Sequence, residues 1–292
     1  MPFRIRAGQY GRFFVLICVA IVMFFPFLWL LISSLKPDDE LFSSSFSLVP
    51  HHITFQHYIQ AFQEEPWGRY FFNSVLTSVL STIGQVIFAA MAGYAFARLR
   101  FPMKSVLFGF LLTGLMVPAE VTLVPVFLLV KHFPLVGGNN VLGAGGSGLV
   151  DTYGGLIIPN LFSVLGIFLM RQFFITLPKS IEEAARIDGC GEFKVFANVM
   201  LPLVRPALIT VAIFAFTGMW DSFLWPLIVL NNSNMFTVQL GLASMSGDPS
   251  SGPSDWGGLL ASSVIVTIPM FVVFFALQRY FLDGIAIGGV KG

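Results

Sequence analysis

Charged residues are scarce in this chain. Only 11% of its 292 residues are Asp, Glu, Lys or Arg, whereas 56% are hydrophobic, and the mean hydropathy is +0.83. Because soluble globular domains carry about 25% charged residues, this composition excludes an ordinary soluble protein and indicates a polytopic membrane protein. The net charge of +1 offers no basic excess, so we expect no nucleic-acid partner.

Cysteine and other metal ligands are also few. Cys18 falls in an apolar run and Cys190 in a loop that we place in the reducing cytoplasm, so we expect no disulfide. His51, His52 and His57 crowd one loop, but no cysteine or close pair of carboxylates completes a metal site. We therefore expect solvated loop histidines and no bound metal.

Several catalytic motifs are missing. The sequence has no G-x-S-x-G and no H-E-x-x-H pattern, which leaves a membrane hydrolase with weak support. It also has no G-x-x-x-x-G-K-[ST] phosphate-binding loop, so any ATP must be bound by another subunit. We therefore expect a protein that is not an enzyme and carries no cofactor.

Long apolar runs are abundant. A helix needs about 20 mostly apolar residues to cross about 30 Å of hydrocarbon. Six runs meet this requirement, and they are Phe13–Leu35, Phe72–Ala97, Val106–Val130, Leu156–Phe174, Ala207–Leu230 and Leu259–Phe281. They predict an all-α polytopic membrane protein with six transmembrane helices in a single domain, residues 1–292. Ala89, Gly93 and Ala97, spaced four apart, predict close packing against another helix.

Lys and Arg gather on one side of these runs. Loops rich in these residues stay in the cytoplasm, and an inner N-terminus places 13 of the 16 there. The outer loops then hold only Lys36, Arg69 and Lys131. We predict that both termini are cytoplasmic.

Four loops organise the chain. Residues 36–70 form an acidic outer loop, and residues 131–155 form an outer loop containing GGNNVLGAGGSG, whose glycines favour turns and offer no packing surface. We expect this second loop to be a flexible insert. The outer loop at 231–258 has no Lys or Arg and is a candidate surface for an external partner, whereas residues 171–205 form a charged cytoplasmic loop.

The loop at 171–205 has the pattern of a short capped helix. Ser180 and Glu183 have the spacing of a capping box, which predicts that a helix begins near Ile181. Gly189 predicts its end, because glycine readily adopts the left-handed conformation found there. A helix of barely two turns is not stable alone in water, so its flanks or a partner must hold it.

Small and apolar side chains on this helix indicate a contact surface. Ala184 and Ala185 permit close approach, and Ile181, Ile187 and Val195 offer apolar contact. This combination suits a helix that inserts into a groove on a second protein. The alternative is an amphipathic loop lying on the inner membrane surface.

One spacing in this loop resembles a known family. Glu183-Ala184-Ala185, Gly189, Val199 and Leu201-Pro202 are similar to the EAA loop of the permease subunits of bacterial ATP-binding cassette importers. Segments elsewhere resemble the maltose-type sugar permeases of that family, namely FFNSV at 71–75, FLMRQFF at 168–174, WDSFLWPL at 220–227 and LQRYFLDGIAIGGVKG at 277–292. The resemblance covers nearly the whole chain.

The resemblance implies a type I importer permease (MetI-like) fold in a multi-pass protein of the bacterial inner membrane. It implies a sugar or oligosaccharide as the substrate, with a second, different permease chain, two ATP-binding cassette subunits and an extracytoplasmic solute-binding protein as partners. Glu183, Ala184, Ala185 and Gly189 would then form the coupling helix, and ATP and Mg²⁺ would be bound by the ATPase.

Acidic residues inside the predicted spans are candidates for the substrate pathway. Glu120 and Asp221 lie at similar distances along their runs, about 22 to 24 Å from the inner edge at 1.5 Å per residue. Trp220 and Trp225 flank Asp221, and aromatic faces beside polar groups suit sugar rings. The alternative is that the carboxylates only hydrogen-bond between helices or lie near the interface.

A different transport class also fits the composition. An ion-coupled secondary transporter of a polar solute would likewise have several spans with carboxylates inside them. It would work without an ATPase and would give no reason for the EAA pattern.

Overall fold

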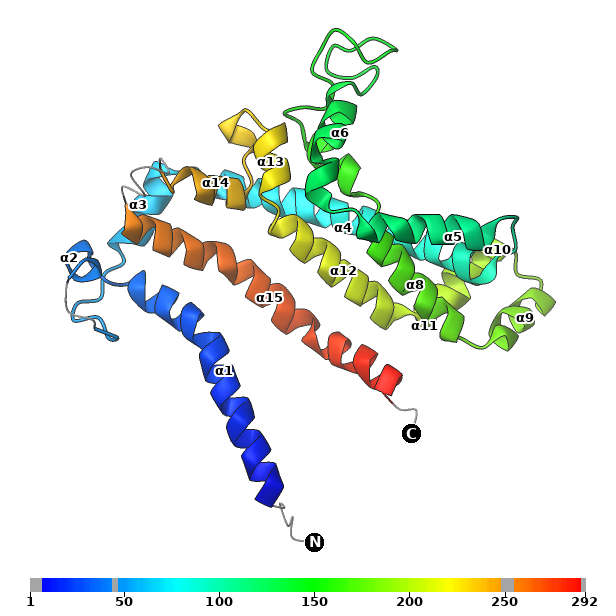
Figure 1. Ribbon diagram of the computed structural model, residues 1–292, viewed down its shortest axis with the longest axis horizontal. Helices are drawn as coiled ribbons and strands as arrows, with labels where there is room; N and C mark the ends of the chain where they lie inside the picture. The colour runs from blue at the N-terminus through cyan, green and yellow to red at the C-terminus, as the bar shows by residue number, and fades with distance from the viewer. Residues whose placement is uncertain (1–6, 44–46, 248–254, 290–292) are drawn as a thin grey trace. The chain divides into compact units, whose positions relative to one another are not determined.

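A computed structural model describes residues 7–43, 47–247 and 255–289 (Figure 1). These residues form helices and loops, with no strand among them. The chain divides into two compact units, residues 1–66 with 242–268, and residues 67–241 with 269–292. The assignment of one domain to the whole chain stays a prediction.

The first unit contains the N-terminal apolar helix. This helix, α1 (Ala7–Ser33), leads into α2 (Asp38–Leu41) and α3 (Gln56–Glu64). Its stretch from Gly11 to Ser33 is long and apolar enough to span a membrane, and none of its most apolar window is buried. A helix with an apolar surface all round belongs in lipid, in agreement with the first predicted span. The last long helix, α15 (Trp256–Gly289), contributes residues to both units.

The second unit is built around α4 (Trp67–Arg98), which α8 (Val164–Thr176) and α12 (Arg205–Trp220) flank (Figure 1). The remaining elements of this unit are α5 (Lys104–Thr113), η1 (Gly114–Met116), α6 (Ala119–Lys131), α7 (Tyr153–Ile157), η2 (Ile158–Asn160), α9 (Lys179–Ile187), α10 (Glu192–Lys194), the π-helical η3 (Val195–Met200), α11 (Leu201–Leu203), α13 (Leu224–Val229), η4 (Ser233–Met235) and the start of α14 (Val238–Ser244).

Three described helices can span a membrane alone, and up to six spans result if each bent helix pair counts as one. The all-helical, multi-span prediction is therefore confirmed. Not every span is a single straight helix, however. The chain bends by 105° between Met116 and Ala119, by 41° between Asn160 and Val164, and by 81° between Leu203 and Arg205.

Proline explains the sharpest bend. We expected one helix over Val106–Val130, but the structure breaks it at Val117, which is extended with φ −87° and ψ 117°. Pro118 follows, and a proline disfavours the helical conformation of the residue before it and cannot donate a backbone hydrogen bond. A new helix, α6, begins at Ala119 with Pro118 as its N-cap.

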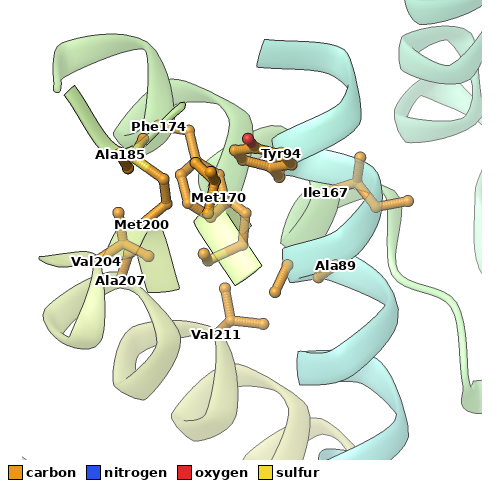
Figure 2. Close-up of a cluster of buried hydrophobic side chains, with 12 residues drawn as sticks. Ala89, Tyr94, Ile167, Met170, Phe174, Ala185, Met200, Val204, Ala207 and Val211 are labelled. Atoms are coloured by element: carbon orange, nitrogen blue, oxygen red, sulfur yellow. The ribbon is translucent and has the colours of Figure 1, made fainter. Parts of the chain in front are cut away.

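A core of buried side chains fixes α4 against α8 and the segment from α9 to α12 (Figure 2). Tyr94 of α4 meets Phe174 of α8 edge to face, with ring centroids 5.4 Å apart. Gly93 allows the close approach, since a Cβ there would stand 2.6 Å from the Cβ of Met170. The predicted close contact at Ala89, Gly93 and Ala97 is confirmed.

The glycine-rich loop is folded on itself. Nδ2 of Asn139 donates to the carbonyl oxygens of Lys131 and Phe133, and its Oδ1 accepts from the N–H group of Gly146. Asn139 is 8% exposed. The turns expected from the glycines are present, with positive φ at Gly137, Gly138, Gly143, Gly145 and Gly148, and the Asn139 side chain bonds to backbone groups before and between them. The flexibility expected of the loop stays a prediction.

Candidate functional site

A cavity of about 400 Å³ lies between α6 and the chain that follows α12. Its lining residues are Ala119, Glu120, Thr122, Leu123, Val126, Asp221, Ser222, Phe223, Leu224 and Trp225. It therefore brings together three of the four residues that the sequence proposed for the substrate pathway. Both carboxylates are exposed, and no Lys or Arg is among the lining residues.

Each carboxylate of the cavity stands at the end of a helix. Glu120 lies in the first turn of α6 because Pro118 interrupts the preceding helix. Asp221 is the C-cap of α12, and its N–H group donates to the carbonyl oxygen of Thr217 at 2.9 Å. The depth derived for Glu120 assumed a straight helix, but the chain bends by 105° just before this residue. The depth itself stays a prediction. The two carboxylates share a cavity because both helices end beside it.

The two tryptophans have different surroundings. Trp225 lines the cavity, and its Nε1 donates to the carbonyl oxygen of Gly155 at 3.1 Å. Trp220 is 1% exposed and stacks on Phe216, with ring centroids 5.8 Å apart. Trp220 is therefore a core residue that does not line the cavity. The sequence pattern alone could not show which tryptophan is buried and which lines the cavity, since both lie in the segment WDSFLWPL.

Sequence reasoning missed two polar lining residues, Thr122 and Ser222. Thr122 donates to the carbonyl oxygen of Ala119 at 2.8 Å, one turn earlier. Ser222 follows Asp221 in the break between α12 and α13. Its position within WDSFLWPL was the available signal, because a serine beside the carboxylate of Asp221 extends the same polar patch.

The predicted coupling helix is α9, which follows the end of α8 (Figure 1). It begins at Lys179 with Pro178 as N-cap and has no side-chain cap, so the predicted capping box was wrong. Ser180 lies inside the first turn and cannot cap it. The end is as predicted: Gly189 has φ +82°, and the N–H groups of Gly189 and Cys190 donate to the carbonyl oxygens of Arg186 and Ala185.

The predicted coupling residues lie on two sides of α9. Glu183, Ala184 and Gly189 are exposed, whereas Ala185 is 8% exposed and belongs to the core. Ile187 is 87% exposed. The exposed surface of α9 therefore includes Glu183, Ala184 and Ile187, whereas Ala185 holds the helix against its own chain.

The predicted apolar contact at Val195 was wrong, because this residue is fully buried in the core. It lies in η3, after the turn at Gly189 has redirected the chain. Phe193 is 75% exposed instead and adds an apolar group to the accessible side of the loop.

Ion pairs connect the charged residues of this loop. Glu182 is 4% exposed and lies 3.0 Å from Nε of Arg98 on α4. Its other oxygen lies 3.6 Å from Arg186, which pairs with Glu192 at 2.8 Å. The hydrogen bond to Glu192 raises the pKa of Arg186 above its ordinary value, so this side chain stays charged.

One histidine of the first loop is not solvated. His51 and His52 are exposed as expected, but His57 is 4% exposed, and its Nε2 lies 2.9 Å from the carbonyl oxygen of Lys36. Its ring packs on Gly257, where a Cβ would stand 2.1 Å from Cε1. The expectation of a solvated side chain was wrong for His57. One possible ligand atom each from Asp38, His57 and Asp255 lies within 4.8 Å of the others. The absence of a metal here stays a prediction.

A sequence match over most of the chain shows the protein family. Residues 85–286 match the family described as "Binding-protein-dependent transport system inner membrane component". The chain belongs to this family. It is a multi-pass membrane permease of a binding-protein-dependent importer, and an ion-coupled secondary transporter is no longer a candidate.

The curated relatives of this permease are transport permeases as well. It is 35% identical to the arabinooligosaccharides transport system permease protein AraQ of Halalkalibacterium halodurans, over 94% of this chain and 93% of that protein. It is 33% identical to the diacetylchitobiose uptake system permease protein NgcG of Streptomyces coelicolor, over 94% and 86%. It is 28% identical to the sn-glycerol-3-phosphate transport system permease protein UgpE of Brucella abortus, over 93% of each.

Solved structures share the fold of this permease. A bacterial ABC transporter involved in the import of the acidic polysaccharide alginate has a chain that matches with a TM-score of 0.79, covering 96% of this chain and 100% of the other at 22% identity. A bacterial alginate ABC transporter in complex with alginate pentasaccharide-bound periplasmic protein matches with a TM-score of 0.60, covering 94% and 96% at 11% identity. The importer permease fold predicted from the sequence is confirmed.

Proposed function

We propose that this permease forms half of the translocation pathway of an ATP-driven importer for a sugar or oligosaccharide, in the cytoplasmic membrane of a bacterium. The observation that carries the proposal is the cavity in which Glu120 and Asp221 face the same space as Trp225. Arabino-oligosaccharides and diacetylchitobiose in the names of relatives support the same class of solute.

The chemistry of the cavity suits a saccharide. Carboxylate oxygens accept hydrogen bonds from sugar hydroxyl groups, and charge-assisted bonds of this kind are stronger than neutral ones. The ring of Trp225 provides an apolar face beside these acceptors, in the pattern of a few polar groups within a mainly apolar pocket. Two carboxylates without a lining Lys or Arg also disfavour an anionic solute.

The energy enters through α9 in this proposal. A cytoplasmic ATPase, present as two subunits that bind ATP and Mg²⁺, receives the exposed side of α9, where Glu183, Ala184 and Ile187 lie. A helix of nine residues with a Gly189 turn at its end is a compact element for a groove on a partner. The ATPase is a separate chain because this sequence has no phosphate-binding loop.

Transport then follows from alternating access. Closure of the two ATPase subunits moves α9, and the movement passes to the spans as a rigid-body rotation that opens the cavity outward. A solute-binding protein delivers the saccharide to the outer loops, and a second, different permease chain forms the other half of the pathway. When the two ATPase subunits separate from each other again, the cavity opens toward the cytoplasm.

The experiment is a tagged purification in mild detergent that compares wild type with Ile187→Asp. The control is Leu142→Asp, because Leu142 is as exposed at 90% but lies in the glycine-rich loop. We expect wild type and the control to bring down a second permease and an ATP-hydrolysing subunit, and Ile187→Asp to lose the ATPase alone. A wild-type chain that purifies without any ATPase would contradict the proposal.

A further inference from the structure

Arg98 lies where three helices meet. It is the last residue of α4, and its Nε lies 3.0 Å from Oε1 of Glu182 on α9, with each side chain 5% exposed. Its Nη2 donates to the carbonyl oxygens of Phe174 and Leu177, at the end of α8. One guanidinium group therefore joins the ends of α4 and α8 to α9.

The short helix α9 depends on such an attachment. It has nine residues and no side-chain N-cap, and helices of this length are unstable alone in water. Pro178 and Gly189 bound it on either side, so neither neighbouring segment continues its hydrogen-bond ladder. Removing one partner of a buried ion pair leaves a charge without compensation, which is strongly unfavourable. The buried pair therefore fixes where α9 stands.

The second ion pair of the loop does not make this connection. Arg186 and Glu192 form two hydrogen bonds, at 2.8 and 3.2 Å, but their side chains are 39% and 56% exposed. Exposed pairs contribute little to stability, and this one stays within the loop. Among the ion pairs of the described residues, only Arg98–Glu182 joins α9 to a membrane-spanning helix.

We propose that the Arg98–Glu182 ion pair is the joint through which a displacement of α9 reaches α4 and α8. This inference rests on the proposed function, in which an ATPase moves α9. Arg98 and Glu182 are positioning residues, since neither lines the cavity. Ala185 also holds α9 against the core, so without the ion pair α9 would stay attached but would pass less of its displacement to α4 and α8.

Packing carries the movement from this joint to the cavity. α4 packs along α8 and α12, with Gly93 pressed against Met170 in the first contact. Asp221, the C-cap of α12, lines the cavity. Closely packed helices of this kind move together as a rigid body, because interdigitated side chains resist shear.

The test uses the complete complex in proteoliposomes and needs no knowledge of the solute. Ser222→Cys places a thiol in the cavity, in a chain whose Cys18 and Cys190 are replaced by serine. The rate at which a membrane-impermeant maleimide labels this thiol is measured with and without Mg-ATP and vanadate. In the otherwise wild-type chain we expect ATP to change this rate, because the cavity would open to the other side of the membrane.

Glu182→Gln is expected to keep the ATPase bound and to reduce the ATP-induced change in labelling about tenfold. The matched control is Glu192→Gln, the same substitution on the exposed pair, which should respond as wild type. An unaltered response in Glu182→Gln would overturn the proposal and leave the proposed function intact. No ATP response in the wild-type background, or no ATPase in the complex, would overturn both.

A second variant covers the case in which Glu182→Gln does not assemble. Arg98→Lys keeps a positive charge beside Glu182 but loses the planar fork that also reaches the two carbonyl oxygens of α8. Loss of the ATP response with the ATPase still bound supports the proposal, and a normal response overturns it. Failure of both variants to assemble would overturn it in favour of a purely structural role.

Discussion

The hydroxyl group of Tyr153 donates a hydrogen bond of 2.7 Å to Oδ1 of Asn73, 80 residues away in the sequence. Nδ2 of the same amide donates at 2.9 Å to the carbonyl oxygens of Asn234 and Phe236. Asn73 is fully buried in α4. One side chain therefore fastens α7 and the segment around η4 to the central helix.

The first prediction concerns this amide. Asn73→Ala leaves two carbonyl oxygens and a hydroxyl group without their partner, and buried polar groups left unpaired cost about 1–3 kcal/mol each. We expect a clear fall in the melting temperature of the purified permease in detergent. The control, Tyr153→Phe, removes one hydrogen bond and should cost about 1 kcal/mol. Equal losses in the two variants would contradict the central role of Asn73.

The second prediction separates two residues of one type. Trp220→Ala empties a fully buried site and should destabilise the permease by about 3–5 kcal/mol. Trp225→Ala changes the cavity wall and should raise the solute concentration needed for half-maximal uptake, with a smaller change in melting temperature. Both quantities are measured for both variants. If the two variants changed the melting temperature and the half-maximal solute concentration alike, Trp225 would have no role of its own in the cavity.

The third prediction addresses the carboxylates of the cavity. Asp221→Ala removes a hydrogen-bond acceptor from the lining and should lower uptake about tenfold while the complex still assembles, since a charged hydrogen bond is worth about 1.5–3 kcal/mol. Asp221→Asn, which keeps one acceptor oxygen, should lose less. Asp39→Ala, at an exposed position outside the cavity, serves as the control. Unchanged uptake in Asp221→Ala would remove this residue from the pathway.

The fourth prediction tests the contact between α4 and α8. Gly93→Ala puts a Cβ 2.6 Å from the Cβ of Met170, so the helices must separate, and overpacking of this kind costs about 1–3 kcal/mol. Gly109→Ala in α5 is the matched control, because its Cβ would meet nothing within 4 Å. The melting temperature should fall for Gly93→Ala and stay level or rise for Gly109→Ala. A fall of the same size in both would contradict the close contact.

The fifth prediction concerns the end of α9. Gly189 has φ +82°, and an L-residue in this left-handed region costs about 1–2 kcal/mol. Because the ATPase is proposed to bind the ordered helix, Gly189→Ala should weaken its association about 5- to 30-fold. Gly191→Ala, at φ −69° with open space around it, should bind normally. Normal binding by both variants would show that the turn is not needed.

Much of the fold was predictable because lipid imposes a simple constraint. Every backbone polar group must be satisfied inside the hydrocarbon, so long apolar runs become helices. The six runs gave helices, and the small residues at Ala89, Gly93 and Ala97 gave a close helix contact. Gly189 ended α9 because its conformational freedom is local. These features depend on a residue and its near neighbours in the sequence.

The site was only partly predictable. The pattern could place Glu120, Asp221 and Trp225 in two spans, but it did not show that α6 and α12 would both end beside one cavity. The same pattern singled out Trp220, which the structure buries. Which of two aromatic residues faces a cavity depends on helix rotation and on partners that are distant in the sequence. For Trp220 such a partner is Phe71, with the two ring centroids 6.0 Å apart.

The sequence by itself determined the class, the helices and the loop in which the EAA pattern lies, because hydropathy and glycine turns are local properties. Only the tertiary structure decided that Glu182, the neighbour of the expected Glu183, is the buried partner of Arg98. Adjacent residues on a helix point about 100° apart, so the packing of α9 against α4 and α8 decides which glutamate turns inward. A charge can be buried there because its counterion, 84 residues earlier in the chain, is brought to it by the fold.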